Sequence, residues 1–248
     1  MHSTLSIKQL SKLFGSLKVI DDISLEVRQH EFVSVIAPSG SGKSTLFHIL
    51  AGIEHPSSGE ILLDKKVVKD RKGKFGFMPQ EASLLPWKTV VENIMLGPVI
   101  SGQSKKIAKE NAHELLRKFD LQDFSNYFSA TLSGGMQQRV ALLRTVLYNP
   151  SFLLLDEPFG SLDALTRHEV QMWLLTVWEK FRSSILFITH DIHEAILLSD
   201  RIYVFSRRPA VIIKEIKVNL PRPRKLTDMT LPQAIKLEKE LLSLLMKA

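Results

Sequence analysis

A glycine-rich segment at residues 37–45, Ala-Pro-Ser-Gly-Ser-Gly-Lys-Ser-Thr, constrains the fold of this 248-residue chain more than any other feature. It follows a β-branched and aromatic run, Phe32 to Ile36, and precedes an apolar run, Leu46 to Leu50. This order predicts a strand, a tight loop and a helix. In such a loop backbone N–H groups point at phosphates, Lys43 reaches the β- and γ-phosphates, and the Ser44 hydroxyl binds Mg²⁺. The segment therefore predicts a nucleotide site rather than a structural Gly/Ser turn.

The first position of this loop is Ala37, where the pattern usually has glycine. The extra methyl group is tolerated if φ is negative there and is unfavourable if φ is positive. We expect nucleotide still to bind. The residues expected to contact it in this loop are Ala37, Pro38, Ser39, Gly40, Ser41, Gly42, Lys43, Ser44 and Thr45.

A second glycine-rich segment, Leu132 to Arg139, reads Leu-Ser-Gly-Gly-Met-Gln-Gln-Arg and is also predicted to open a helix. Both segments have the pattern of a phosphate-binding loop, and one subunit does not need two such loops. We therefore expect the second segment to serve a neighbouring subunit.

Two carboxylates follow a short apolar run at Phe152 to Leu155. Such a run predicts a buried parallel strand, and ligands bind at the carboxyl ends of strands in open α/β sheets. Asp156 is then placed to hold Mg²⁺, directly or through water, and Glu157 to polarise the attacking water as general base. The alternative is that these acids cap the next helix.

Polar side chains also end the apolar run Ile185 to Thr189. An isolated histidine here is usually a core or cap residue, but His190 is also placed to donate a hydrogen bond to a γ-phosphate. His193 lies three residues on and suggests a metal pair with His190. No third ligand accompanies the two, so we do not expect zinc.

Two further candidates lie nearer the amino terminus. Gln80 follows a third strand-like run, Phe75 to Met78, and is either a solvated loop residue or a sensor of Mg²⁺ and the attacking water. Phe14 precedes the strand-like Ile23 to Val27, and is either a core residue or a stacking partner for adenine.

Taken together, these motifs closely resemble those of the ATP-binding subunits of ABC transporters, over essentially the whole chain. In family order they are Phe14, residues 37–45, Gln80, the signature Leu132 to Gln137, Asp156-Glu157 and His190. Gly160-Ser161-Leu162-Asp163 also resembles the loop that couples two such subunits, with Ser161 where alanine is common.

The resemblance implies a head-to-tail dimer, with identical subunits expected, that holds ATP between the phosphate loop of one subunit and the signature of the other. It implies catalytic roles for Lys43, Glu157 and His190, and Mg²⁺ binding at Ser44, Gln80 and Asp156. The other nucleotide contacts that it implies are Phe14, Ser133, Gly134, Gly135, Gln137 and Asp163.

The same resemblance implies an α/β fold: a P-loop NTPase core with a mainly parallel sheet, an N-terminal antiparallel β subdomain and an inserted α-helical subdomain. We expect a single ABC ATPase domain over residues 1–248. Its nucleotide-binding core is assigned to 1–81 and 139–220, the helical insert with the signature to 82–138, and a basic tail and helix to 221–248.

Two helix starts are predicted from capping patterns. Ser104 is expected to cap a helix with apolar residues at helical spacing, and Thr230 to Gln233 resembles a capping box that opens a C-terminal helix. The apolar residues Ile235, Leu241, Leu242 and Leu245 of that second helix are expected on one packed side.

Composition and hydropathy fit a protein that acts at a membrane only through a partner. The chain has no cysteine, which agrees with a reducing cytoplasm, and Met1 to Thr4 leads on without the charged and apolar regions of a signal peptide. No apolar run reaches the roughly twenty residues that span a bilayer. We expect a place on the cytoplasmic face of the membrane, held by a polytopic permease, with an extracytoplasmic solute-binding protein in the full system.

A large aromatic residue sits beside proline in Leu84-Leu85-Pro86-Trp87-Lys88-Thr89. Trp87 is either buried or part of the groove that, in this family, receives a coupling helix of the permease. With residues 198–209 and 220–224, this turn resembles the branch that imports nitrate, sulfonates, taurine and thiamine precursors. The solute itself is chosen elsewhere, by the permease and the binding protein.

The net charge of +7 is concentrated at the carboxyl end, because residues 201–248 hold eleven Lys or Arg against four Asp or Glu. Nucleic acid and anionic lipid are possible partners for such a tail, but a solvated basic face is favoured over both. No nucleic-acid partner is expected.

Two other functions remain as alternatives. One is a soluble ABC-type ATPase that remodels a nonmembrane partner, although this chain has neither paired ATPase units nor a long coiled coil. The other is a P-loop kinase, which leaves Leu132 to Arg139 unexplained.

Overall fold

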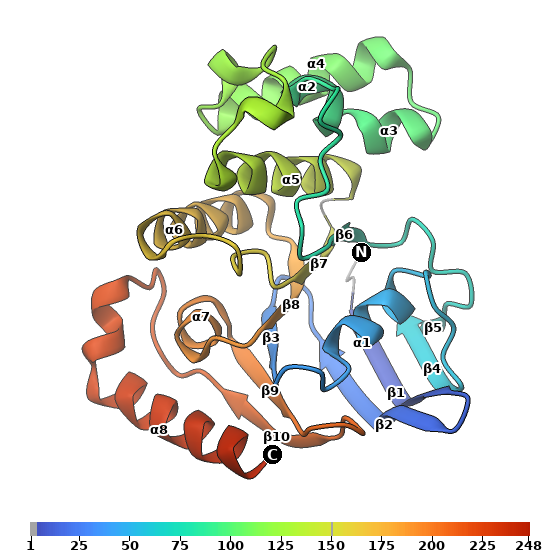
Figure 1. Ribbon diagram of the computed structural model, residues 1–248, viewed down its shortest axis with the longest axis vertical. Helices are drawn as coiled ribbons and strands as arrows, with labels where there is room; N and C mark the ends of the chain where they lie inside the picture. Colours follow the sequence, from blue (N-terminus) through green and yellow to red (C-terminus); the bar gives the residue numbers. More distant parts are fainter. Residues whose placement is uncertain (1–3, 150) are drawn as a thin grey trace.

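A six-stranded sheet, in the order β10-β9-β3-β8-β7-β6, forms the centre of the computed structural model, which describes residues 4–149 and 151–248 (Figure 1). Five strands run parallel, and β10 is antiparallel to β9 at one edge. The strands are β3 (Phe32–Ile36), β6 (Gly76–Met78), β7 (Phe152–Asp156), β8 (Ser184–Thr189), β9 (Arg201–Phe205) and β10 (Ile212–Lys217). The expectation that the chain starts without a signal peptide used Met1 to Thr4. Residues 1–3 of that segment lie outside the described residues.

Both faces of this sheet are buried, as the continuous apolar runs predict. Successive residues of β7 alternate between two cores: Leu153 and Leu155 join one, and Phe152 and Leu154 join the other. All five residues of β7 are buried. The prediction of a mainly parallel sheet is confirmed.

An antiparallel sheet at the amino terminus covers one face of the core. Its order is β2-β1-β4-β5, and its side chains share a core with α1 and with alternate residues of the main strands (Figure 1). The elements are β1 (Leu5–Phe14), β2 (Leu17–Val27), α1 (Lys43–Leu50), β4 (Ser58–Leu63) and β5 (Lys66–Val67).

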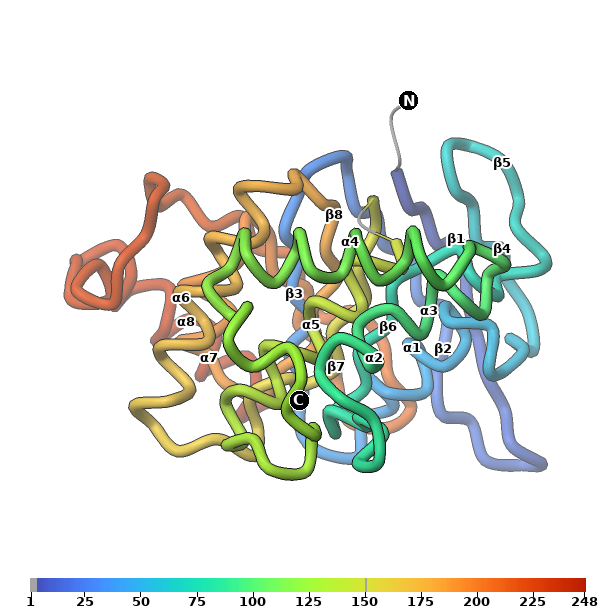
Figure 2. The backbone as a smooth tube through the Cα atoms, turned by 90° about the horizontal axis from the view of Figure 1, so that it is seen from above, coloured from blue at the N-terminus to red at the C-terminus, as the bar shows by residue number. Residues whose placement is uncertain are grey.

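Helices cover the opposite face and extend into a separate helical layer (Figure 1). Seen from above, α4 crosses the top of the molecule (Figure 2). The prediction for Ser104 is confirmed, because its Oγ accepts a hydrogen bond from Ile107 N at 3.4 Å. The helices are α2 (Val90–Ile94), α3 (Leu96–Ile100), α4 (Lys105–Lys118), α5 (Gly134–Tyr148), α6 (Ala164–Phe181) and α7 (Ile192–Leu198), with 3₁₀ turns at Gln122–Phe124 and Ser129–Thr131.

The predicted capping box at Thr230 is wrong. Thr230 ends a 3₁₀ turn, Leu226–Thr230, and its Oγ1 donates to Thr227 O at 2.8 Å. The C-terminal helix α8 (Pro232–Lys247) begins instead at a proline, whose fixed φ suits the first turn and whose missing N–H is not needed there. Helix α8 therefore starts at Pro232 and has no side-chain cap.

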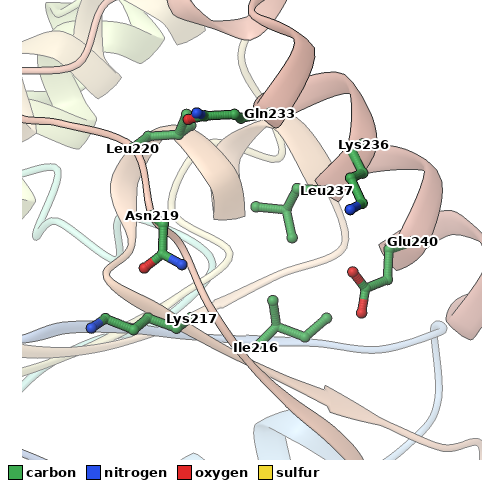
Figure 3. Close-up of a pocket in the computed structure, with 8 residues that line it drawn as sticks. All are labelled: Ile216, Lys217, Asn219, Leu220, Gln233, Lys236, Leu237 and Glu240. Carbon is green, nitrogen blue, oxygen red and sulfur yellow. The ribbon is translucent and has the colours of Figure 1, made fainter.

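Helix α8 packs against α7 and β9, but the prediction of one packed side is wrong for Ile235 and Leu242, which are exposed. Leu241 is fully buried, whereas Leu242 is half exposed. A pocket of about 340 Å³ remains between α8 and β10, with Leu237 pointing into it from the helix and Ile216 from the strand (Figure 3). None of the predicted site residues lines this pocket.

The favoured interpretation of a solvated basic face over residues 201–248 is wrong for three of its arginines. Arg201 is 7% exposed and donates to Glu31 Oε1 at 2.6 Å. Arg224 is only 1% exposed, and its guanidinium donates to the carbonyls of Ile196 and Ser199 at 2.9 and 2.5 Å. Arg222 donates to Asp200 Oδ1 at 2.8 Å and lies 4.2 Å from the Trp178 ring centroid. These charges stabilise the fold rather than face solvent.

No helix within residues 4–149 and 151–248 has the length and apolar character needed to cross a bilayer.

Candidate active site

The carboxyl ends of four neighbouring parallel strands bring the predicted catalytic residues to one edge of the sheet. The phosphate loop follows β3, Gln80 follows β6, Asp156 ends β7 just before Glu157, and His190 follows β8. Residues 39–45 line a pocket of about 330 Å³ together with Gln80, Glu157 and Arg208. The parallel topology explains this convergence, because parallel strands all end at the same edge.

The phosphate loop folds tightly around the Lys43 ammonium. Lys43 Nζ donates to the carbonyls of Ala37 and Pro38 at 3.1 and 3.2 Å, and lies 3.6 Å from Glu157 Oε1. Burial lowers the pKa of Lys43, and the nearby Glu157 carboxylate opposes that shift. Only glycine fits at Gly42, where φ is 113° and a Cβ would lie 2.9 Å from Val19 Cγ1.

Ala37 is not among the described non-glycine residues with positive φ, and it is buried at 2% exposure. The methyl group therefore costs nothing in backbone conformation at this position. We expect Ala37→Gly to change the dissociation constant for ATP by less than about threefold, measured by titration calorimetry.

Gly42→Ala is the matched comparison in the same loop. We expect it to weaken ATP binding by at least about tenfold, because its φ is left-handed and the added Cβ meets β2. An Ala37→Gly protein that binds ATP tenfold more tightly would show instead that the alanine impairs the loop.

One hydrogen bond and one ion pair join the three residues predicted to be catalytic. His190 Nδ1 donates to Glu157 Oε2 at 2.8 Å, and the other carboxylate oxygen faces Lys43. Glu157 has a φ of 43°, in the left-handed region, and its N–H donates to Ile188 O at 2.9 Å. The β8 backbone thus fixes an uncommon conformation that directs the carboxylate toward both partners. A carboxylate so held can accept a proton from water in the pocket.

Asp156 fits a divalent cation. It is 4% exposed, its Oδ1 is buried without a hydrogen-bond partner among the described residues, and burial raises its pKa, opposed by a hydrogen bond from Ser44. Mg²⁺ is usually held by one or two carboxylates together with substrate phosphates and water. The unsatisfied Asp156 oxygen and the Ser44 hydroxyl supply the oxygen ligands that such an ion takes.

The two histidines suggested as a metal pair have different partners. His193 Nε2 lies 3.2 Å from Glu238 Oε1 on α8, whereas His190 contacts Glu157. Within residues 4–149 and 151–248, no group of three or more His, Cys, Asp or Glu side chains is placed to hold a metal. His193 therefore links α7 to α8.

The signature lies at the start of α5 and borders a second pocket of about 480 Å³. Ser133 caps α5, and its Oγ accepts a hydrogen bond from Met136 N at 3.4 Å. A Cβ on Gly135 would lie 2.4 Å from Thr166 Cγ2, so a larger residue there would force α5 or the Thr166 side chain on α6 to shift. Gln80, Gly134, Gln137, Gly160 and Ser161 are among the residues that line the pocket.

Some of the predicted nucleotide contacts line neither of these pockets: Phe14, Ala37, Pro38, Ser133, Gly135 and Asp163. Asp163 caps α6 by accepting hydrogen bonds from the N–H groups of Leu165 and Thr166 at 3.2 and 3.1 Å. Phe14 is 44% exposed, so the core alternative is wrong, and Lys12 Nζ lies 4.5 Å from its ring centroid.

Sequence reasoning missed two residues at this edge. Arg208 reaches the phosphate loop from the turn between β9 and β10. Glu194 is buried on α7, where it accepts hydrogen bonds from Thr189 Oγ1 and Gln171 Nε2 at 2.5 and 3.0 Å. Burial raises the pKa of Glu194. A sequence signal was available only for Glu194, a lone acid in an apolar helical run.

Comparisons with known proteins identify the family of this chain. Residues 20–160 match the family model described as ABC transporter. The chain is 42% identical over 234 residues to the aliphatic sulfonates import ATP-binding protein SsuB of Bacillus thuringiensis subsp. konkukian, covering 93% of this chain and 92% of that protein. It is 40% identical over 246 residues to the formylaminopyrimidine import ATP-binding protein ThiZ of Halalkalibacterium halodurans, covering 98% and 96%.

A solved structure has the same fold. It is the dimeric, post-hydrolysis state of the ATP-binding cassette MJ0796 bound to ADP and Pi, with a TM-score of 0.73 and 30% identity over 88% of this chain and 100% of that one. Family, fold and the convergence of motifs at one sheet edge agree, and the chain therefore belongs to the ABC transporter family as one of its ATP-binding, ATP-hydrolysing subunits.

Proposed function

We propose that two copies of this chain pair head-to-tail around two ATP molecules, so that each nucleotide lies between the phosphate loop of one copy and the signature of the other. The observation that carries this proposal is the separation of the two phosphate cradles into different pockets, both bordered by Gln80. A ligand that bridges two subunits through its γ-phosphate loses one set of contacts after hydrolysis. ATP turnover then alternately closes and opens the dimer.

Within each half-site we assign roles by position and chemistry. Lys43 and the loop N–H groups bind the phosphates, while Ser44, Asp156 and Gln80 hold Mg²⁺, which neutralises phosphate charge when bound. Glu157 takes a proton from the attacking water, and His190 orients Glu157 and contacts the γ-phosphate. Phe14 stacks on adenine. Ser133, Gly134, Gly135 and Gln137 contact the nucleotide of the partner subunit, and Asp163 lies at the dimer interface.

We further propose that the dimer drives import of a small solute through a permease at the cytoplasmic face of the membrane. The relatives named above import aliphatic sulfonates and formylaminopyrimidine, and a related nitrate import ATP-binding protein is known from Synechocystis, at 40% identity over 225 residues. The solute is proposed to belong to this group of small nitrate-, sulfonate-, taurine- or thiamine-precursor-type compounds. An extracytoplasmic binding protein would deliver it.

The helical layer offers a surface for the permease. A groove of about 500 Å³ is lined by the apolar residues Val91, Met95, Leu96 and Val99, and by polar residues that include Lys88, Lys105, Lys106 and Lys109. The neighbouring Trp87 is 69% exposed, which removes the alternative that it is buried. An exposed tryptophan beside a groove with apolar lining residues is typical of a protein contact.

Trp87→Ala is expected to lower solute transport by at least about tenfold, because an interface tryptophan contributes several kcal/mol. ATP binding should stay within about twofold, because Trp87 lines neither phosphate pocket. The measurement is uptake into proteoliposomes beside ATP affinity. Val67→Ala, an exposed apolar residue on β5, is the control. Equal losses of transport and ATP binding would contradict the assignment.

Copurification tests the transport proposal as a whole. A tagged copy expressed with its neighbouring genes and solubilised in mild detergent should retain a polytopic permease. Recovery with ribosomes or a soluble assembly scaffold, and no permease, would favour the alternative of a soluble remodelling ATPase.

A further inference from the structure

Arg208 enters the phosphate pocket from a segment that no nucleotide-binding motif includes. Its Nη2 donates to Gly40 O at 2.9 Å, across 168 positions of sequence. It lines the same pocket as residues 39–45, Gln80 and Glu157. The guanidinium therefore lies where the phosphate loop receives its ligand.

The turn that carries Arg208 is held in place by hydrogen bonds at both ends. The Ser206 hydroxyl donates to Pro209 O at 2.9 Å and accepts from Val211 N at 3.0 Å. Ala210 is buried and pairs with β2, accepting from Asp21 N and donating to Val19 O, each at 2.9 Å.

The same short stretch of β2 also contacts the phosphate loop. A Cβ on Gly42 would lie 2.9 Å from Val19 Cγ1, so Val19 touches the loop on one side and the Arg208 turn on the other. The turn and the loop thus share one rigid support. This support fixes the backbone from which the Arg208 side chain extends, so anion binding does not have to order the turn as well.

Arg208 is exposed, and no carboxylate within residues 4–149 and 151–248 forms an ion pair with its guanidinium. Its planar group has five N–H donors, and Gly40 O accepts only one of the bonds. Lys43, by contrast, is buried, and its ammonium group already donates to two carbonyls and faces the Glu157 carboxylate. Arginine binds phosphate oxygens through paired hydrogen bonds.

We propose that Arg208 is a phosphate-binding residue of the ATP site, which adds a second cation to Lys43 from the β9–β10 turn. The proposal deepens the ATPase function and rests on it. It predicts that the removal of this charge weakens ATP binding, and that the effect depends on ionic strength, because an exposed charge is screened by salt.

Arg208→Ala is expected to raise both the dissociation constant and the KM for ATP by about tenfold at low salt. The difference from wild type should shrink in 0.5 M NaCl. Arg208→Lys, which keeps the charge, should recover part of the affinity, and Arg208→Gln, which keeps a donor but no charge, should not. MgATP is the probe, and wild-type binding in the same assay tests the ATP site separately.

Arg207→Ala is the matched control, because Arg207 is the exposed neighbour on the same turn and does not line the pocket. It should bind ATP as wild type does. The proposal is overturned if Arg208→Ala binds ATP normally with an unchanged KM. Wild-type affinity for ATP in Arg208→Gln would also overturn it, and so would a loss of affinity that does not depend on salt. Either result would mean that Arg208 only stabilises the phosphate loop through its hydrogen bond to Gly40 O. Circular dichroism and a thermal melt identify a variant that fails to fold.

Discussion

Glu157→Gln should lower the steady-state rate of ATP hydrolysis by about 10²- to 10⁴-fold, the range associated with loss of a general base. Glutamine has the same size as glutamate and can still accept a hydrogen bond from His190, which now lies 2.8 Å from the carboxylate. It cannot take a proton from water. Phosphate release, measured with excess ATP and Mg²⁺, gives the rate.

The same substitution should preserve or prolong the ATP-held dimer. The charge of Lys43, which now faces Glu157 at 3.6 Å, would be free for phosphate in the variant. Size-exclusion chromatography with ATP should therefore show a stable dimer for Glu157→Gln and a short-lived one for wild type. Glu60→Gln, at an exposed position on β4, is the control for both measurements. Normal ATPase activity in Glu157→Gln would exclude Glu157 as the base.

Arg224→Met is expected to lower the free energy of unfolding by about 3–5 kcal/mol, because each buried polar group left without a partner costs about 1–3 kcal/mol. The side chain is 1% exposed and donates to carbonyls at Ile196, Ser199 and Leu220, at 2.9, 2.5 and 3.3 Å. Methionine fills similar space but leaves these buried oxygens without donors. Burial lowers the pKa of Arg224 to about 10, which still leaves the guanidinium charged at neutral pH.

Urea unfolding followed by circular dichroism measures this loss. Arg28→Met, at an exposed position after β2, should change stability by less than about 0.5 kcal/mol. The free energy of unfolding of Arg224→Lys should lie between those of Arg224→Met and Arg28→Met, because one ammonium group cannot donate to all the carbonyls that the guanidinium reaches. Equal stabilities for Arg224→Met and Arg28→Met would show that the buried network contributes little.

The strands and the site were predictable where the determining pattern is local. The runs before Ala37, Asp156 and His190 are short, apolar and followed by polar groups, and all three form parallel strands that end at one edge. The pattern of a capping residue followed by helical periodicity was equally local at Ser104. It misled at Thr230, because Pro232 starts α8 and Thr230 bonds backward into its own turn.

The amino-acid type alone did not determine which charged and aromatic side chains are buried. The run at residues 221–224 contains two arginines, and composition alone favoured solvent for both. Their burial depends on carbonyls at the end of α7 and on Trp178, which come from other parts of the chain. Trp87 is the opposite case, since it is exposed although tryptophan is usually buried.

The sequence by itself determined the phosphate loop, the signature, and the polar residues placed at strand ends, because each depends on backbone preferences and spacing within about ten residues. Only the tertiary structure decided that φ at Ala37 is not positive, that the two phosphate cradles lie in different pockets, and that Arg208 joins the first of them. The physical reason is distance along the chain. A hydrogen bond such as that from Arg208 to Gly40 joins residues 168 positions apart, and their two loops lie together because both contact β2.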